Sequence, residues 1–244
     1  MEYISGQDLR AIFDRARGLG RSLDLGLCAH IVMEVCEALD YAHRKTNARL
    51  EPLNLIHRDV SPQNIIVGYD GTVKLIDFGI AKATGQINQT QAGILKGKFS
   101  YMSPEQARGY PIDSRSDLFG LGAVLYEIIT LERCFLGQSD FSTIERVRNV
   151  EYQQPRRIRR DIPVALERLI RRALAKTPEE RFQSAADLQE TLRQLVRAHR
   201  MQRKREDLGA FMGELFSQEI AAERERCGAQ LSESAERAFW LRSL

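Results

Sequence analysis

The stretch that constrains the fold most is residues 57–79, HRDVSPQNIIVGYDGTVKLIDFG. Two short β-rich runs, NIIV and TVKLI, flank the turn GYDG, a pattern that predicts a tight β-hairpin. A hairpin returns the chain to the place where it started. Asn64, just before the first run, and Asp77, just after the second, should therefore lie at one end of the hairpin, close to Asp59.

The polar side chains at that end suit phosphate chemistry. Two oxygen ligands side by side, from Asn64 and Asp77, are typical of Mg²⁺, which keeps water and phosphate oxygens as its other ligands. Asp59 can then orient an attacking hydroxyl group and accept its proton. The sequence therefore predicts a magnesium–phosphate site with a carboxylate base beside it.

Helical periodicity dominates the remaining chain. Apolar residues recur near helical spacing over residues 22–47, with Ser22 as the expected N-cap. Residues 117–131 are apolar nearly all round and should form a helix that runs through the core. Three further helices are expected, over 140–149, 164–175 and 184–200. The pattern predicts a helical lobe with one small hairpin.

The last part of the chain has a different character. MQRKRED is a charged linker, and LGAFMGELFSQEI predicts an amphipathic helix. The apolar face of that helix carries Leu208, Phe211, Met212, Leu215 and Phe216. Packing of this helix on the same domain is favoured, and docking of a partner protein is the alternative.

Composition excludes several classes of protein. With 43% hydrophobic and 28% charged residues the chain is typical of a soluble globular protein. The net charge of +3, from 36 basic and 33 acidic residues, is too small and too mixed to predict nucleic-acid binding. The basic cluster PRRIRR at 155–160 favours a solvated loop over a phosphate- or partner-binding patch.

Cysteine usage and hydropathy bear on the compartment. The four cysteines are far apart and form no metal-binding or disulfide pattern, which predicts a reducing, cytoplasmic setting. The longest apolar run, at 118–131, is too short to span a bilayer. The first residues, MEYISGQD, lack the apolar core of a signal peptide.

The motifs, in their order, resemble those of protein kinases. HRD with an asparagine five residues after the aspartate, then a hairpin, then DFG at 77–79 and SPE at 103–105, are similar to the catalytic loop, magnesium loop and activation-segment end of that family. The resemblance extends over most of residues 1–198 and is closest to bacterial eukaryotic-like (Hanks-type) serine/threonine kinases. It implies an α+β protein kinase-like fold and transfer of the γ-phosphoryl group of ATP, with Mg²⁺, to protein hydroxyls in signal transduction.

The resemblance also implies regulatory and structural roles. Arg58 resembles the arginine that binds a phosphate on the activation segment, residues 77–105. Thr90 is the best-placed acceptor for that phosphate. Three residues have implied structural roles. Glu105 and Arg181 resemble an ion pair of the family, and Asp117 resembles the aspartate that holds the catalytic-loop backbone.

The opening MEYISGQDL resembles the kinase hinge and the start of the next helix. In that register Met1 takes the gatekeeper position, and the backbones of Glu2 and Ile4 meet the adenine edge. Asp8 reaches the ribose, and Ile66 forms the floor under the base. The resemblance thus places the beginning of this sequence in the middle of a nucleotide site.

The smaller, β-rich lobe of a kinase has no counterpart in these 244 residues. GLGRSL at 18–23 has no third glycine, GLGAVL at 120–125 falls inside the expected core helix, and no V-A-I-K lysine is present. The expectation is a hinge and large lobe over 1–198 followed by a linker and helical tail over 199–244. Met1 as an internal methionine or a truncated gene is the favoured explanation.

Two alternatives stay open: a naturally shortened binding module and a small lobe encoded separately. The 244 residues by themselves should bind ATP poorly and turn over little. A non-catalytic scaffold that presents the docking face of the lobe is the alternative to a kinase.

Two positions depart from the usual serine/threonine kinase pattern. The family usually has a lysine two residues after the catalytic aspartate, where this sequence has Ser61, and a threonine where GKFSYMSPE has Lys98. The two positions lie close together in the family, so the sequence suggests an exchange in which Lys98 reaches Asp59 and the phosphoryl group. An exposed Lys98 with an unrelated change at Ser61 is the alternative. Both usual markers of serine/threonine specificity over tyrosine specificity are absent.

Overall fold

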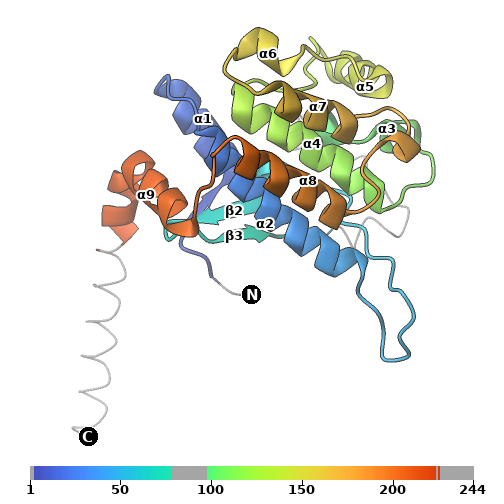
Figure 1. The fold of residues 1–244 in the computed structure, drawn as a ribbon, viewed down its shortest axis with the longest axis horizontal. Coiled ribbons are helices and arrows are strands. Elements are labelled where there is room, and N and C mark those ends of the chain that lie inside the picture. The colour runs from blue at the N-terminus through green and yellow to red at the C-terminus, as the bar shows by residue number, and fades with distance from the viewer. Residues whose placement is uncertain (1–2, 79–97, 224, 226–244) are drawn as a thin grey trace, which may run out of the picture.

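The structure is a computed structural model, and it describes residues 3–78, 98–223 and 225. Helices make up most of the described chain, and a small sheet lies at one end of the molecule (Figure 1). The longer helices are α1 (Leu9–Gly18), α2 (Leu25–His43), α4 (Ser114–Thr130), α5 (Asp140–Asn149), α7 (Val164–Ala173), α8 (Ala185–Ala198) and α9 (Arg205–Leu215). Short helical turns are η1 (Pro62–Asn64), η3 (Lys98–Tyr101), α3 (Pro104–Arg108), α6 (Pro155–Ile158) and η4 (Pro178–Glu180).

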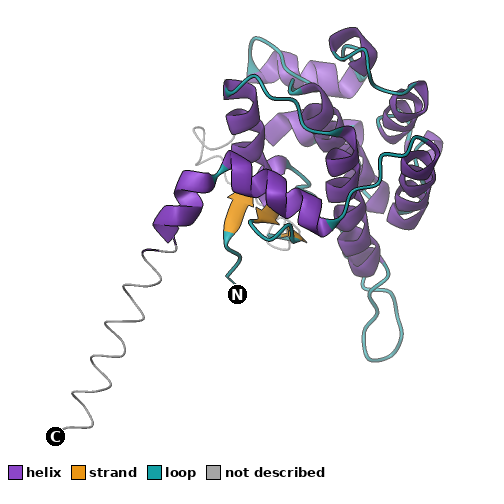
Figure 2. Ribbon diagram, turned by 60° about the vertical axis from the view of Figure 1, so that its left-hand side comes forward, coloured by secondary structure: helices purple, strands orange, loops and turns teal. Residues whose placement is uncertain are grey.

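The sheet has three short antiparallel strands, gathered on one side of the helices (Figure 2). In sheet order they are β1 (Gly6–Asp8), β2 (Ile65–Gly68) and β3 (Val73–Leu75). β2 and β3 confirm the predicted hairpin, and Gly71 in its turn has the positive φ of 83° that favours glycine. β1 is too short to show an alternating pattern; pairing with β2, which sets Asp8 opposite Ile66, makes it a strand.

Helix α4 confirms the expected core helix. Its residues from Ser116 to Thr130 are all buried, and α2 and α7 both pack on it. The approach of α7 is close, because a Cβ atom added to Gly122 would lie 2.9 Å from the Cβ of Ala173. Glycine at this position therefore sets the spacing between the two helices.

Two local predictions were wrong. Helix α2 begins at Leu25, and its N-cap is Asp24, not Ser22, because the Asp24 carboxylate accepts hydrogen bonds from the amides of Gly26 (2.9 Å) and Leu27 (3.1 Å). The basic cluster at 155–160 is not entirely loop, since α6 begins on its proline, whose fixed φ suits a first helical position.

The amphipathic helix after the charged linker packs on the same chain. Helix α9 contacts α1 and α2, and its apolar face is buried at Leu208, Met212, Leu215 and Phe216, with Phe211 partly buried. Its first turn also touches the hairpin turn, since a Cβ atom added to Gly71 would lie 2.0 Å from the carbonyl oxygen of Arg205.

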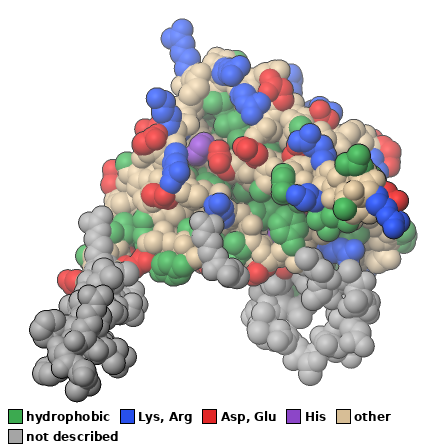
Figure 3. Space-filling view, turned by 90° about the horizontal axis from the view of Figure 1, so that it is seen from below, with side chains coloured by type: hydrophobic (Ala, Val, Ile, Leu, Met, Phe, Trp, Pro, Cys, Tyr) green, Lys and Arg blue, Asp and Glu red, His purple; other side chains and the backbone are tan. Residues whose placement is uncertain are grey.

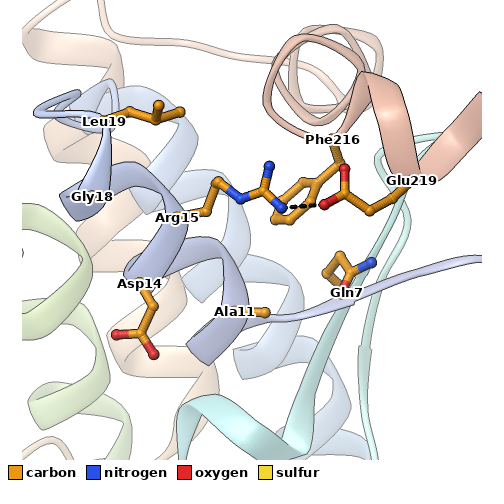
Figure 4. Close-up of a pocket in the computed structure, with 8 residues that line it drawn as sticks. All are labelled: Gln7, Ala11, Asp14, Arg15, Gly18, Leu19, Phe216 and Glu219. Carbon is orange, nitrogen blue, oxygen red and sulfur yellow. Dashed lines mark hydrogen bonds and ion pairs between the residues drawn. The ribbon is translucent and has the colours of Figure 1, made fainter.

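A cavity of about 430 Å³ lies between α1 and the segment that follows α9 (Figure 4). The Arg15 guanidinium crosses it, pairs with Glu219 and lies 5.0 Å from the centre of the Phe216 ring. These contacts attach the end of the described chain to α1.

In the described part of the chain, every helix is too short or too polar to cross a lipid bilayer. On the face that is lowest in Figure 1, hydrophobic side chains gather in the middle and charged side chains surround them (Figure 3).

Candidate active site

The start of the loop HRDVSPQN is hydrogen-bonded to one buried carboxylate. Asp117, in the first turn of α4 and only 2% exposed, accepts hydrogen bonds from the amides of His57 (2.8 Å, Oδ2) and Arg58 (2.8 Å, Oδ1). The His43 ring nitrogen Nε2 lies 2.8 Å from the same carboxylate. Arg58 has a positive φ of 69°, a conformation that side chains other than glycine adopt with strain. Both carboxylate oxygens therefore fix a strained backbone.

The far end of the loop is tied to the residues that follow the hairpin. The side-chain Nδ2 of Asn64 donates to the Asp59 carbonyl oxygen at 2.7 Å, and the Ile76 amide donates to the Asn64 carbonyl oxygen at 2.9 Å. His57 Nε2 lies 2.9 Å from the Ile76 carbonyl oxygen. These bonds hold Asp59, Asn64 and Asp77 at the same end of the hairpin.

A buried ion pair braces the segment after the loop. Arg181, 1% exposed, donates to both oxygens of Glu105 at 2.7 and 2.8 Å, and the Ser116 hydroxyl donates to Glu105 at 2.6 Å. Burial alone would raise the pKa of Glu105, but the bonds from Arg181 and Ser116 outweigh it and lower the pKa from 4.5 to about 2. The carboxylate is ionised at any physiological pH.

A second buried cluster was not predicted from the sequence. Glu127 of α4 is fully buried, accepts from Arg10 Nη1 at 2.8 Å and accepts from the Tyr101 hydroxyl. Burial raises the pKa of Glu127, although its hydrogen bond with Tyr101 and the charge of Arg10 oppose that rise. The sequence does mark Glu127 as unusual, because this acidic residue interrupts an otherwise apolar run at 118–131. The residues that pair with it cannot be predicted from helical periodicity.

Known proteins are similar to this chain in sequence and in fold. A family model described as the protein kinase domain matches residues 1–193, well over half of the chain. The chain belongs to the protein kinase family.

Several bacterial protein kinases are similar in sequence. Tyrosine-protein kinase MasK of Myxococcus xanthus is 37% identical over 226 residues, which cover 93% of this chain and 35% of that protein. Serine/threonine-protein kinase PknB of Mycolicibacterium smegmatis is 36% identical over 203 residues, 82% of this chain and 30% of that protein. The chain thus spans about a third of the length of the curated relatives it matches.

A solved structure gives the same fold. The PknI kinase domain of Mycobacterium tuberculosis superposes with a TM-score of 0.58 at 27% identity, covering 80% of this chain and 63% of that one. The protein kinase-like fold expected from the motifs is therefore confirmed. The match to MasK covers 93% of the chain and so extends beyond residue 193, where the family model ends.

The kinase site can be tested for its fit to Mg²⁺. Because the Asn64 Nδ2 group donates to the loop backbone, its Oδ1 is the atom that remains to face a cation. Asp77 has a positive φ of 58°, and the residue before it, Ile76, is hydrogen-bonded through its amide to the Asn64 carbonyl oxygen. One amide oxygen and one carboxylate on a braced backbone suit an ion that takes few protein ligands.

The predicted nucleotide edge is only partly described. Asp8 caps α1, since its carboxylate accepts from the Ala11 amide at 2.8 Å, a use that the sequence analysis did not foresee. Asp8 lies opposite Ile66 in the sheet register, and Ile66 and Ile4 are half-buried. Glu2 lies outside the described residues.

Of the two departures from the usual kinase pattern, the structure describes Ser61 fully and Lys98 only by its backbone. The Ser61 hydroxyl is buried and has no hydrogen-bond partner in the described residues, as is also true of Ser100. The backbone of Lys98 begins η3, but its side chain lies outside what the structure describes, as does Thr90 entirely. The exchange between Ser61 and Lys98 therefore stays a prediction.

Proposed function

We propose that residues 1–198 form the hinge and large lobe of a protein kinase domain and that residues 199–244 form a charged linker and helical tail. In this proposal the domain transfers the γ-phosphoryl group of ATP to hydroxyl groups of protein substrates. The observation that carries the proposal is the hydrogen-bonded frame of the catalytic loop. Asp117 holds its start at 2.8 Å, and Asn64 and Ile76 close its end at 2.7 and 2.9 Å.

The roles within that frame follow from charge and donor chemistry. Mg²⁺ held by Asn64 and Asp77 would neutralise charge on the ATP phosphates. Asp59 orients the substrate hydroxyl and accepts its proton as the phosphoryl group leaves ATP. The backbones of Glu2 and Ile4, with Asp8 and Ile66, hold the nucleoside.

We assign serine and threonine as the acceptors. The names of the relatives divide, since MasK is named a tyrosine kinase and PknB a serine/threonine kinase. Ser61 and Lys98 depart from the pattern of serine/threonine kinases. If Lys98 reaches Asp59 and the phosphoryl group in place of the lysine usually found at position 61, phosphoryl transfer to serine and threonine is preserved. Phosphoamino-acid analysis of a labelled protein substrate tests the assignment, and phosphotyrosine as the main product would overturn it.

Phosphorylation of Thr90 is proposed to order the activation segment. A phosphate there would accept charge-assisted hydrogen bonds from Arg58. Arg58 is well placed for this role because its backbone is fixed at both polar groups. Its amide donates to Asp117 at 2.8 Å, and its carbonyl oxygen accepts from the Gln106 side chain at 3.0 Å. Full activity of Thr90→Ala in a chain that carries a kinase small lobe would refute this role.

Phosphotransfer itself is tested with radiolabelled ATP and a generic protein substrate. The polypeptide for this assay is the 244-residue chain joined at residue 1 to a kinase small lobe. Asp59→Asn is expected to lower the rate by about 10²–10⁴, the usual range for a lost general base. Asp140→Asn is the matched control, since Asp140 is exposed on α5 and should leave the rate unchanged. Equal rates for wild type and Asp59→Asn would assign the activity to a contaminant.

A further inference from the structure

The end of the molecule opposite the sheet carries a basic pocket. A cavity of about 640 Å³ opens between the end of α5 and helix α7, a size typical of ligand sites. Figure 1 shows α5, α6 and α7 together at this end, away from the strands. We define the basic pocket by its lining: Val150, Tyr152, Arg168, Arg171, Arg172, Leu174, Ala175, Lys176 and Glu180.

The segment that includes most of this pocket carries more net positive charge than the whole chain. Residues 155–176 hold eight basic and two acidic side chains, a net charge of +6, although the whole chain has +3. The acidic members are Asp161, paired with Arg159, and Glu167, which accepts from the Arg156 amide. Charge is therefore segregated toward this end of the molecule.

Three of the pocket cations have no acidic partner within the described part of the chain. Arg168, Arg171 and Lys176 are exposed and form no ion pair with any residue that the structure describes. Arg172 is instead held with its guanidinium 4.2 Å from the centre of the Phe182 ring. The rim carboxylate of Glu180 lies 3.3 Å from the Thr177 hydroxyl. A ligand that binds here would meet unpaired positive charge.

The floor of the pocket is apolar and rigid. The Tyr152 ring packs edge-on against Tyr126 and Phe135, with centroids 5.7 and 5.8 Å away, and Leu174 is buried beneath. Arg181 donates to the carbonyl oxygens of Ala175 (2.7 Å) and Lys176 (3.0 Å), which fixes the far wall. A preformed floor lowers the conformational entropy lost on binding.

Val150 adds an apolar side chain to the pocket lining from a strained position. It caps the end of α5 with a positive φ of 57°, a conformation that strains a β-branched side chain and that glycine adopts freely. A valine here is unfavourable for the cap, yet its side chain forms part of the pocket lining.

We infer that the basic pocket is a docking site for an acidic peptide segment of a partner protein, with one aliphatic or aromatic side chain seated on the apolar floor. Carboxylates would pair with Arg168, Arg171 and Lys176, whose positive charge is not matched by any described acidic residue. A concave apolar floor ringed by cations fits such a segment better than it fits a flat lipid surface. Single-stranded nucleic acid favours several exposed aromatic rings for base stacking, and the pocket lining has one aromatic residue, Tyr152.

The test is direct binding to the full 244-residue chain, measured by fluorescence anisotropy at low salt. The probe is a labelled heptapeptide with a central leucine between two runs of three glutamates. Two counterparts carry serine in place of the leucine or lysines in place of the glutamates. The leucine–glutamate peptide should bind about tenfold tighter than the serine version, from burial of one side chain, and the lysine version should not bind.

Matched variants locate the site. Arg168→Glu with Arg171→Glu should weaken binding of the leucine–glutamate peptide by about two- to 25-fold, since each exposed ion pair contributes up to roughly fivefold. Arg17→Glu with Arg197→Glu makes the same charge change at exposed arginines of α1 and α8 and should have little effect. Val150→Gly should keep or raise the melting temperature and still weaken the leucine peptide several-fold.

Three outcomes would overturn the inference. The first is equal binding of the glutamate and lysine peptides, and the second is an equal loss of peptide affinity in the control double variant. The third is binding of anionic vesicles or single-stranded RNA that is tighter than binding of the leucine–glutamate peptide and is abolished by the Arg168 and Arg171 changes. The assay needs no catalysis, so its failure is distinct from failure of the phosphotransfer assay.

Discussion

The two ends of the β2–β3 hairpin are held in opposite ways. At the end with Asn64 and Asp77, the Asn64 side chain donates to the Asp59 carbonyl oxygen at 2.7 Å, and the Ile76 amide donates to the Asn64 carbonyl oxygen at 2.9 Å. The start of the adjoining loop is bonded at 2.8 Å to the Asp117 carboxylate, which is 2% exposed. At the turn end, Asp70 pairs with Arg205 of α9, and these side chains are 60% and 55% exposed. The hydrogen bond from the Thr72 amide is the largest contribution that lowers the pKa of Asp70.

The difference separates a functional frame from a surface attachment. Buried bonds to backbone amides leave expensive unsatisfied groups when one partner is removed, whereas an exposed ion pair is replaced by water. The hairpin is thus fixed by buried hydrogen bonds where we place the chemistry, and by close backbone contact and an exposed ion pair where the tail begins. Substitutions at buried and at exposed positions test that contrast.

Asp117→Ala should be the most damaging change. It leaves the amides of His57 and Arg58 and the His43 ring without an acceptor, at about 1–3 kcal/mol for each buried group. We expect a loss of about 3–6 kcal/mol in the free energy of unfolding, measured by urea denaturation. Asp140→Ala, at an exposed carboxylate, should cost less than about 0.5 kcal/mol. Similar losses for both variants would contradict the frame.

Glu105→Ala should cost about 3–5 kcal/mol, because it leaves Arg181 charged and buried without its partner. The wild type should also be sensitive to acid. The pKa of Glu105 is lowered from 4.5 to about 2 in the fold, so its contribution to stability is present above pH 4.5 and is lost as the pH falls toward 2. Glu105→Gln should lack this component of the pH dependence. Glu179→Gln, at the exposed partner of Arg115, serves as the control and should retain it.

Lys98→Ala tests the proposed exchange in the catalytic loop. If Lys98 contacts the transferred phosphoryl group, kcat should fall by about 10²–10³ in the chain joined to a small lobe. Ser61→Lys with Lys98→Thr should then recover more activity than either single change, which a double-mutant cycle measures. Additive effects would indicate that the two departures are unrelated.

Arg205→Ala should have the smallest effect, below about 1 kcal/mol in unfolding free energy, because the Arg205–Asp70 pair is exposed. High salt should reduce even that difference. A loss as large as that of Asp117→Ala, in the same urea titration, would remove the contrast between the two hairpin ends.

The sequence predicted those parts of the fold that local pattern controls. The hairpin, the buried α4 and the closeness of Asn64 to Asp77 follow from alternation, apolar content and turn chemistry. Strand β1 could not be predicted, because three residues carry no pattern and their pairing with β2 joins positions some sixty residues apart. The contact of Arg10 with Glu127 was also hidden, since 117 residues separate them. At the start of α2, the expected cap was Ser22, and the observed cap is Asp24, two residues later.

In our proposal, the loop end of the hairpin holds a metal–nucleotide complex and the turn end does not. Mn²⁺ can stand in for Mg²⁺, and its binding with ADP can be followed by electron paramagnetic resonance in the chain joined to a small lobe. We predict that Asp77→Asn weakens the Mn²⁺–ADP complex by at least about tenfold, as for other lost metal-site partners. Asp70→Asn, the same change at the other end of the hairpin, should leave it unchanged. Equal weakening by both variants, or none by Asp77→Asn, would contradict the account.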